Sequence, residues 1–173
     1  LNLTADYDPQ ANVAAPAPGA AGTDGASGEA FTIKLAHESG LTLGGGNMKV
    51  GNTAARVGES AATGYAKYSN GGLTVGYQEF YYNNHTGGAD TDGDGMAIAY
   101  TAGDVTISYS VMNEQTNAHG ATAALEEEEI SAFQAAYTMG GMTLAASMYE
   151  TDNTEGVAGN KYEETELSVS FAF

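Results

Sequence analysis

The chain has no cysteine, no tryptophan and no long apolar run. Without cysteine it can form no disulfide, no thiolate metal site and no thiol nucleophile. A membrane-spanning helix needs about 20 mostly apolar residues, and no segment approaches that length, so a helical membrane protein is excluded. Basic residues are also scarce, with 5 Lys and Arg against 22 Asp and Glu and a formal net charge of −17. Because phosphate recognition needs clustered basic side chains, we expect no nucleic-acid partner.

Glycine and tyrosine are abundant instead, with 24 Gly and 11 Tyr among 173 residues, and the mean hydropathy is only −0.25. Apolar residues occur in short segments where they alternate with small or polar ones, as from Val105 to Val111. This two-residue period is that of a β-strand with one apolar face. The alternation predicts ten strands, near residues 1–7, 31–36, 41–43, 63–68, 73–81, 96–100, 105–111, 133–137, 142–148 and 166–173.

Short and long connections alternate strictly between these strands. Short turns are predicted at Ser39-Gly40, Asn70-Gly71, Ala102-Gly103-Asp104 and Gly140-Gly141, and long polar loops at 8–29, 44–59, 83–95, 113–128 and 150–161. Within the second loop, Gly44 to Gly46 could form a bulge through which Met48 and Val50 extend the third strand. A soluble β-sandwich does not place its long and short connections systematically at opposite ends. Outer-membrane β-barrels do, with short periplasmic turns and longer extracellular loops.

The chain ends on a strand whose apolar face runs through Leu167, Val169, Phe171 and Phe173. A final strand that stops on an aromatic residue resembles the closing strand of Gram-negative outer-membrane barrels. The resemblance implies that Phe173 helps the barrel assembly machinery to recognise the chain.

The last third is the most specific part: Ala135 to Tyr149, a loop, and the terminal Leu-Ser-Val-Ser-Phe-Ala-Phe. In this pattern the chain resembles the C-terminal portion of a Gram-negative general porin of the alphaproteobacterial type. The resemblance implies an all-β fold, an antiparallel transmembrane β-barrel in the bacterial outer membrane. Members of that family have sixteen strands, form homotrimers and pass small hydrophilic solutes by passive diffusion.

We therefore expect residues 1–173 to form a single outer-membrane β-barrel domain that holds the last ten of sixteen strands. Its expected partners are outer-membrane lipid and lipopolysaccharide. The family's constricting loop follows an early strand that this sequence does not contain. A complete ten-stranded barrel is the alternative, because ten is an even number and both ends would be periplasmic.

The residues opposite the apolar stripes are small or polar, which suits a water-filled lumen better than a filled one. Charged and amide side chains at such positions should line the pore: Lys34, Lys67, Gln78, Gln134 and Glu166. Aromatic residues near the strand ends should form the interfacial girdles: Tyr7, Tyr68, Tyr81, Tyr82, Tyr100, Tyr149, Tyr162, Phe171 and Phe173.

Asp90, Asp92 and Asp94 are spaced two residues apart before Gly95, a pattern that can wrap oxygen ligands around Ca²⁺. The full calcium-loop pattern fails, since its twelfth position is Thr101 rather than Glu, and a plain acidic loop tip is the alternative. The three histidines show no metal-ligand spacing, and no Gly-x-Ser-x-Gly elbow occurs. We expect no enzymatic activity and no cofactor other than this calcium ion.

The acidic residues concentrate in the predicted loops, including Glu126 to Glu129. A negative field at the outer mouth of a pore would favour cations. The sequence thus favours a cation-preferring diffusion channel. The alternative is a non-transporting surface β-barrel or β-sheet protein with a structural or adhesive role.

Overall fold

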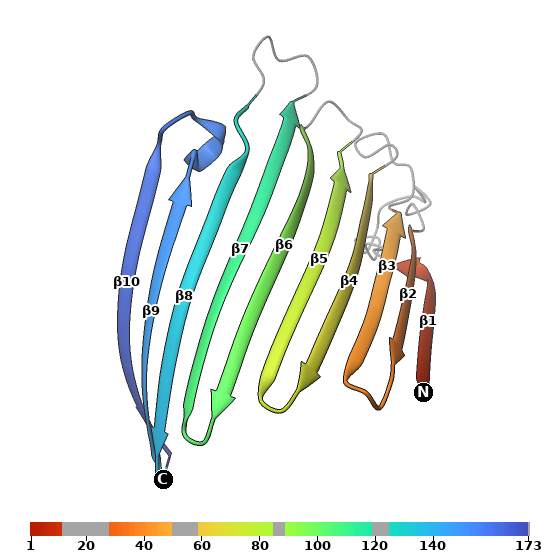
Figure 1. Cartoon of the computed structure of the whole chain (residues 1–173). Helices are drawn as coiled ribbons and strands as arrows, with labels where there is room; N and C mark the ends of the chain where they lie inside the picture. The colour runs from red at the N-terminus through yellow and green to blue at the C-terminus, as the bar shows by residue number, and fades with distance from the viewer. Residues whose placement is uncertain (12–27, 50–58, 85–88, 119–124, 173) are drawn as a thin grey trace, which may run out of the picture.

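The protein is all-β, and its ten strands form one antiparallel sheet in chain order (Figure 1). A computed structural model describes residues 1–11, 28–49, 59–84, 89–118 and 125–172. The strands are β1 (Asn2–Ala11), β2 (Gly28–Ala36), β3 (Leu41–Lys49), β4 (Ser60–Asn70), β5 (Leu73–Asn83), β6 (Ala89–Ala102), β7 (Val105–Ala118), β8 (Glu128–Met139), β9 (Met142–Asp152) and β10 (Lys161–Phe171), with a 3₁₀ turn η1 (Thr154–Gly156) between the last two. In the part of the chain described, no helix is long and apolar enough to cross a membrane.

All four predicted short turns are confirmed, and they lie at one end of the sheet, opposite the longer connections (Figure 1). The β4–β5 turn consists of Gly71 and Gly72 alone, with φ of 58° and 86°. Two consecutive positive φ angles give a two-residue hairpin whose twist matches the flanking strands, and glycine adopts them without steric cost. The residues of the turn therefore determine which positions of the two flanking strands pair at this end of the sheet.

The strands extend further toward the long connections than the apolar alternation predicts. β6 begins at Ala89 and β7 continues to Ala118, so residues 89–95 and 113–118, which were expected to lie in loops, belong to strands. The pairing Ala89↔Ala118 shows that the ladder persists through this polar stretch. Backbone hydrogen bonds need no apolar side chains, so polar residues continue a strand once its partner is in register.

The glycine triplet Gly44 to Gly46 forms no bulge. β3 pairs without a register shift with both neighbours, and Gly44 lies between Lys34 and Tyr65. The extension of the strand through Met48 is confirmed, whereas Val50 lies outside the described residues.

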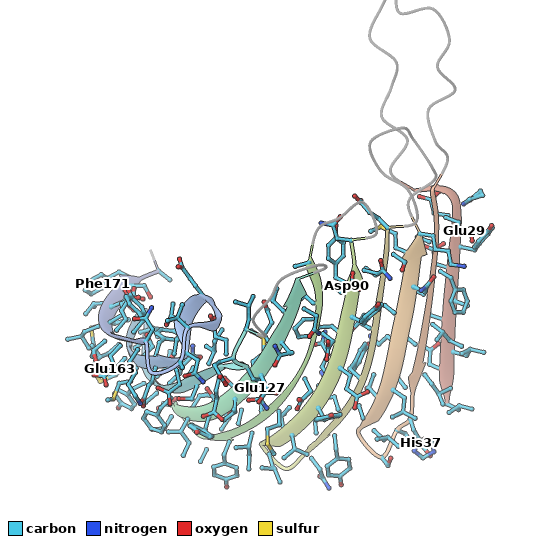
Figure 2. The ribbon with its side chains drawn as sticks, turned by 90° about the horizontal axis from the view of Figure 1, so that it is seen from above. Glu29, His37, Asp90, Glu127, Glu163 and Phe171 are labelled. Atoms are coloured by element: carbon cyan, nitrogen blue, oxygen red, sulfur yellow. The ribbon has the colours of Figure 1, made fainter. Side chains whose placement is uncertain are left out.

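The sheet is curved and has one apolar face, which is its convex face. Figure 2 shows aromatic rings projecting from the convex surface. On β7 the apolar Val105, Ile107 and Tyr109 are exposed, while Thr106 and Ser108 between them are partly covered. Curvature spreads the side chains of a convex face and crowds those of a concave one. We therefore name the two surfaces the convex apolar face and the concave small-residue face.

The sheet has no packed core of its own. Among the described residues no large side chain is fully buried, and Ala132 is the buried hydrophobic one. Met96 and Leu167, on the convex face, are 63% and 71% exposed. Since apolar burial is the main force that stabilises water-soluble folds, something outside the described chain must cover this face.

The apolar residues of the convex face form a band that crosses the strands obliquely. Phe31 on β2 stands in the same cross-strand row as Asp92 on β6, through Asn47, Ala62 and Tyr81. Met96 on β6 likewise shares its row with Glu150 on β9, through Val111 and Ser131. The edge of the band nearer the long connections thus shifts toward the short turns from β2 to β9. The strands are inclined to the band.

Candidate functional site

The five residues expected to line a pore all lie on the concave small-residue face. Lys34, Gly44, Tyr65 and Gln78 share one cross-strand row over β2 to β5. Gln134 and Glu166 share another, on either side of Ser147. The strand register therefore brings the five side chains to one surface, although they lie on five different strands.

A hollow of about 430 Å³ lies on this face between β4 and β7, and Lys67 and Gln78 line it. It exists because Gly76 and Gly95, from β5 and β6, carry no side chain to fill it. A second hollow of about 240 Å³ lies between β7 and β10, where Gln134 and Glu166 stand among small residues. The remaining concave-face lining of this hollow is Thr106, Ser108, Ala136, Ala145, Ser147 and Ser168.

Hydrogen bonds fix both amides of the concave face. Gln78 donates through Nε2 to Thr63 Oγ1 at 2.9 Å, and Thr63 Oγ1 donates to the Glu79 carbonyl oxygen at 2.9 Å. Gln134 donates through Nε2 to the Tyr149 hydroxyl at 2.9 Å. These groups present fixed polar atoms to a hydrated surface and leave Lys67 and Glu166 as exposed charges.

Three of the expected girdle tyrosines face the other way. Tyr82, Tyr149 and Tyr162 alternate with the convex residues of their strands, so they lie on the concave face. Tyr162 donates to Glu164 Oε2 at 3.0 Å there. Their girdle assignment was wrong, because proximity to a strand end does not reveal which face a side chain occupies. The convex face does hold the other described girdle residues: Tyr7, Tyr68, Tyr81, Tyr100 and Phe171.

Tyr65 is a concave-face residue that sequence reasoning missed. A Cβ placed on Gly44 would lie 2.5 Å from Tyr65 Cζ, so the ring lies directly over that glycine. The glycine triplet was the available signal, since a strand glycine often marks the close approach of another group. The ring occupies the wall between Lys34 and Gln78 in the row described above.

Carboxylates outnumber amines on the concave face. Besides Glu166, the strand register places Glu114, Glu128 and Glu164 on it, from β7, β8 and β10. Asp6 and Asp8 join them from β1. Lys34 and Lys67 are the bases on the described part of this face. The face therefore carries a net negative charge.

Asp90, Asp92 and Asp94 belong to β6 and not to a loop. Their spacing of two places all three on the convex face, where Asp90 Oδ1 accepts from the Asn84 amide at 2.9 Å and Asp92 Oδ1 from Asn117 Nδ2 at 3.2 Å. Carboxylates that point the same way from an extended strand cannot encircle one ion as a loop does. Within the described ranges no group of three or more His, Asp or Glu side chains is arranged to hold a metal ion, and calcium binding stays a prediction.

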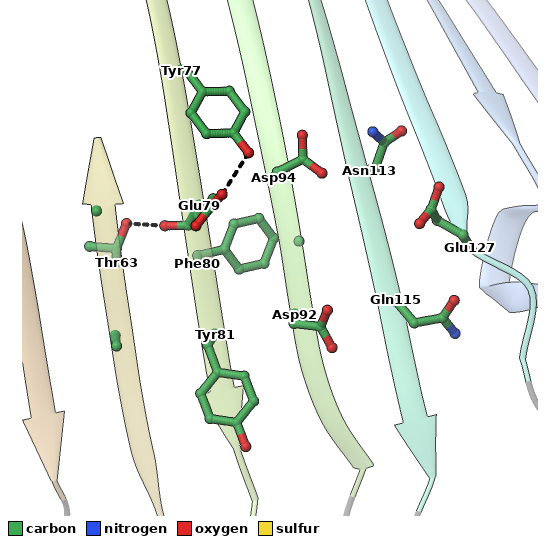
Figure 3. Close-up of a pocket in the computed structure, with 13 residues that line it drawn as sticks. Thr63, Tyr77, Glu79, Phe80, Tyr81, Asp92, Asp94, Asn113, Gln115 and Glu127 are labelled. Atoms are coloured by element: carbon green, nitrogen blue, oxygen red, sulfur yellow. Dashed lines mark hydrogen bonds between the residues drawn. The ribbon is translucent and has the colours of Figure 1, made fainter. Parts of the chain in front are cut away.

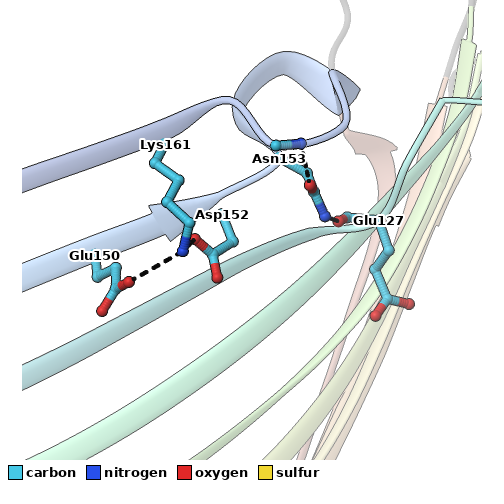
Figure 4. A network of polar contacts seen from close by, with 6 residues as sticks. Glu127, Glu150, Asp152, Asn153 and Lys161 are labelled. Carbon is cyan, nitrogen blue, oxygen red and sulfur yellow. Dashed lines mark hydrogen bonds and ion pairs between the residues drawn. The ribbon is translucent and has the colours of Figure 1, made fainter.

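The acidic run at Glu126 to Glu129 is tied to the β9–β10 connection (Figure 4). Asn153 Nδ2 donates to the Glu127 carbonyl oxygen at 2.9 Å, and the Glu155 amide donates to Glu128 Oε2 at 2.8 Å. Lys161, expected in the loop, begins β10 and pairs with Asp152 at 2.6 Å and Glu150 at 3.5 Å. The ion pairs of Lys161 are exposed and therefore contribute little to stability. Glu128, in contrast, accepts from the Glu155 amide and so helps to fix the β9–β10 connection.

Phe173 lies outside the described residues. Its neighbour in the alternation, Phe171, is 60% exposed on the convex face. No family model matches this chain, and a comparison with curated proteins finds no match either.

Proposed function

We propose that the chain forms the wall of an outer-membrane diffusion channel that passes small hydrophilic solutes and prefers cations. The observation that carries the proposal is the division of one sheet into a convex apolar face and a concave small-residue face. A membrane barrel has this arrangement, with lipid outside and water inside. In lipid the exposed Met96 and Leu167 would need no protein partner.

The oblique apolar band supports the same proposal. Barrel strands are tilted by about 35–45° from the axis, so a band parallel to the membrane must cross their cross-strand rows at an angle. The boundary from Phe31 on β2 to Met148 on β9 does so. β1 and β10 would have to be joined within the closed wall, through further strands or to each other, because unpaired backbone groups do not occur in lipid.

The concave face supports transport rather than a purely structural role. Many of its central positions are glycine, alanine or serine, as at Gly76, Gly95, Ser110 and Ser147, although Tyr65, Phe80 and Met112 also lie there. Such side chains would leave the interior open to water. The surplus of carboxylates over Lys34 and Lys67 would favour cations within the channel.

Conductance measurements test this proposal. The protein, extracted with detergent and added to a planar bilayer, should produce discrete ohmic steps, and its reversal potential in a salt gradient should indicate cation preference. That preference should weaken as salt shortens the Debye length from about 10 Å at 0.1 M to about 3 Å at 1 M. A heat-modifiable trimer on gels is the expected oligomer.

A protein that inserts into vesicles without conducting would favour the alternative, a surface β-barrel with a structural role. Partition into the aqueous fraction without detergent would contradict a membrane location altogether. Replacing Glu126, Glu127 and Glu129 by Gln should reduce cation preference without changing conductance in concentrated salt. Glu128 is left intact because it holds the Glu155 amide.

A further inference from the structure

A groove runs along β4 on the convex apolar face. Between Ser60 and Tyr68 the convex positions of β4 are Ala62, Gly64 and Ala66, and none has a side chain larger than a methyl group. The side chains beside them on β5 are large, with Tyr77 opposite Ala66 and Tyr81 opposite Ala62. Two hollows of about 490 and 460 Å³ follow this line, and Tyr77 lines both.

The half of the groove nearer the short turns is apolar. Its convex-face lining is Leu41, Ala66, Tyr68, Val75, Tyr77, Met96, Ile98 and Tyr109. Its volume lies within the roughly 300–1,000 Å³ range of small-molecule sites. An alkyl chain meets only carbon-rich surface here.

The half nearer the long connections is acidic (Figure 3). Glu79, Asp92, Asp94 and Glu127 line it together with the amides of Asn113 and Gln115, and no Lys or Arg is among its lining residues. Tyr77 donates its hydroxyl to Glu79 Oε1 at 2.8 Å, which fixes that carboxylate at the junction of the two halves. A ligand group placed among these carboxylates should carry positive charge and N–H donors.

We propose that this groove binds a phospholipid with a primary ammonium headgroup, of the phosphatidylethanolamine type. The ammonium lies among Glu79, Asp92 and Asp94, and one acyl chain follows Ala66 toward the short turns. Asn113 is the amide available to donate to the lipid phosphate, because Gln115 Nε2 already donates to the Leu125 carbonyl oxygen at 2.9 Å. This inference rests on the proposed membrane location but not on channel activity.

The charge of the groove separates ethanolamine lipids from other membrane lipids. Anionic lipids, lipopolysaccharide included, would meet four carboxylates without an intervening base. A choline headgroup carries the charge but no N–H to donate. Because a hydrogen bond to a charged group is worth about 1.5–3 kcal/mol, preference over choline of about tenfold or more is expected.

Intact-complex mass spectrometry tests the inference directly. Full-length protein in detergent is titrated with ethanolamine, choline and glycerol phospholipids of identical acyl chains. Wild type should retain the ethanolamine lipid about tenfold more tightly than the others. Glu79→Gln with Asp94→Asn should bring the ethanolamine-to-choline ratio near one, and Ala66→Leu should weaken both lipids by filling the apolar half.

Two control variants test whether any loss of charge or gain in size on the convex face changes lipid binding. Glu163→Gln removes a convex-face carboxylate from β10, and Ala135→Leu enlarges a convex-face alanine of β8; neither should change lipid retention. Equal retention of all three lipids, preference for the glycerol lipid, or Mg²⁺-dependent capture of lipopolysaccharide in their place would overturn the inference. Channel conductance recorded from the same preparations keeps the two questions apart. Conductance without lipid preference overturns only the groove, and lipid preference without conductance overturns only the channel.

Discussion

Individual glycines decide how closely neighbouring strands and side chains approach in this sheet. Gly64 on β4 faces open space, whereas Gly93 on β6 lies against the Asn113 carbonyl oxygen and the Phe80 ring. Both belong to strands in the structure, and their surroundings cannot be read from the neighbouring residues in the chain. Their different surroundings follow from the pairing partners across the sheet.

Gly93→Ala should therefore destabilise the folded protein where Gly64→Ala does not. A Cβ at Gly93 would overlap the Asn113 carbonyl oxygen and lie 2.5 Å from Phe80 Cζ. Overpacking of this kind typically costs about 1–3 kcal/mol. Urea unfolding in detergent micelles measures the difference, and equal midpoints for the two variants would contradict the packing around Gly93.

Single charges on the concave face should also be measurable. A charge about 10 Å from a passing ion is worth about 0.4 kcal/mol in water, a factor of about two. Because the charge acts on cations and anions with opposite sign, Lys67→Gln should raise the cation-to-anion permeability ratio by about the square of that factor, about fourfold. Glu166→Gln should lower the ratio by a similar factor. Ser110→Ala, which changes no charge on the same concave face, is the control and should leave the reversal potential unchanged.

At the scale of elements, two-residue hairpins set the strand pairing at one end. Gly72 faces the Thr101 carbonyl oxygen of β6, while Gly71 faces open space. Gly72 also pairs through its backbone, since its carbonyl oxygen accepts from the Thr101 amide at 3.0 Å. The β4–β5 turn is thus joined to the next hairpin.

Asparagine substitutions separate the two turn positions. Gly71→Asn should be nearly neutral, because asparagine tolerates a φ of 58° and no neighbouring atom opposes its side chain. Gly72→Asn should cost about 1–3 kcal/mol, because its Cβ would overlap the Thr101 carbonyl oxygen. The loss of folded, heat-modifiable protein after refolding checks this order.

At the scale of the whole molecule, apolar surface faces out along a curved sheet and no core exists within the described strands. The molecule is stable only when another medium or another chain covers the convex face. The alternation of short turns and long connections gives the sheet two different ends. In the proposed barrel these ends lie on opposite sides of a membrane.

The absence of cysteine makes this orientation testable, because each introduced thiol is the only one in the chain. Glu126→Cys and Val157→Cys, near the long connections, should react with a membrane-impermeant maleimide on intact cells. Asn70→Cys and Asp104→Cys, near the short turns, should react only after lysis. The reversed pattern would contradict the proposed orientation, and labelling of all four on intact cells would contradict a membrane barrier between the ends.

Sequence patterns predict the all-β fold, the ten strands, the four short turns and the common face of the five residues expected to line a pore. Each of these depends on short-range features: a two-residue period, or glycine at a positive φ. A strand such as β7 can be read from its own residues, since alternating side chains always point to opposite faces.

Pairing across the sheet determines where the strands end and which residues meet on neighbouring strands. Asp90 to Asp94 carry no strand signal of their own, yet the pairing with β7 keeps them in β6. The pairing of β3 with β4 places Tyr65 over Gly44. The pairing of β5 through β8 brings four carboxylates from three strands or their ends into one groove. Backbone hydrogen bonds between strands do not depend on which side chains the residues carry. The hairpins set the register, and the paired strands keep it along their whole length. Register is therefore a property of the sheet and not of any one segment.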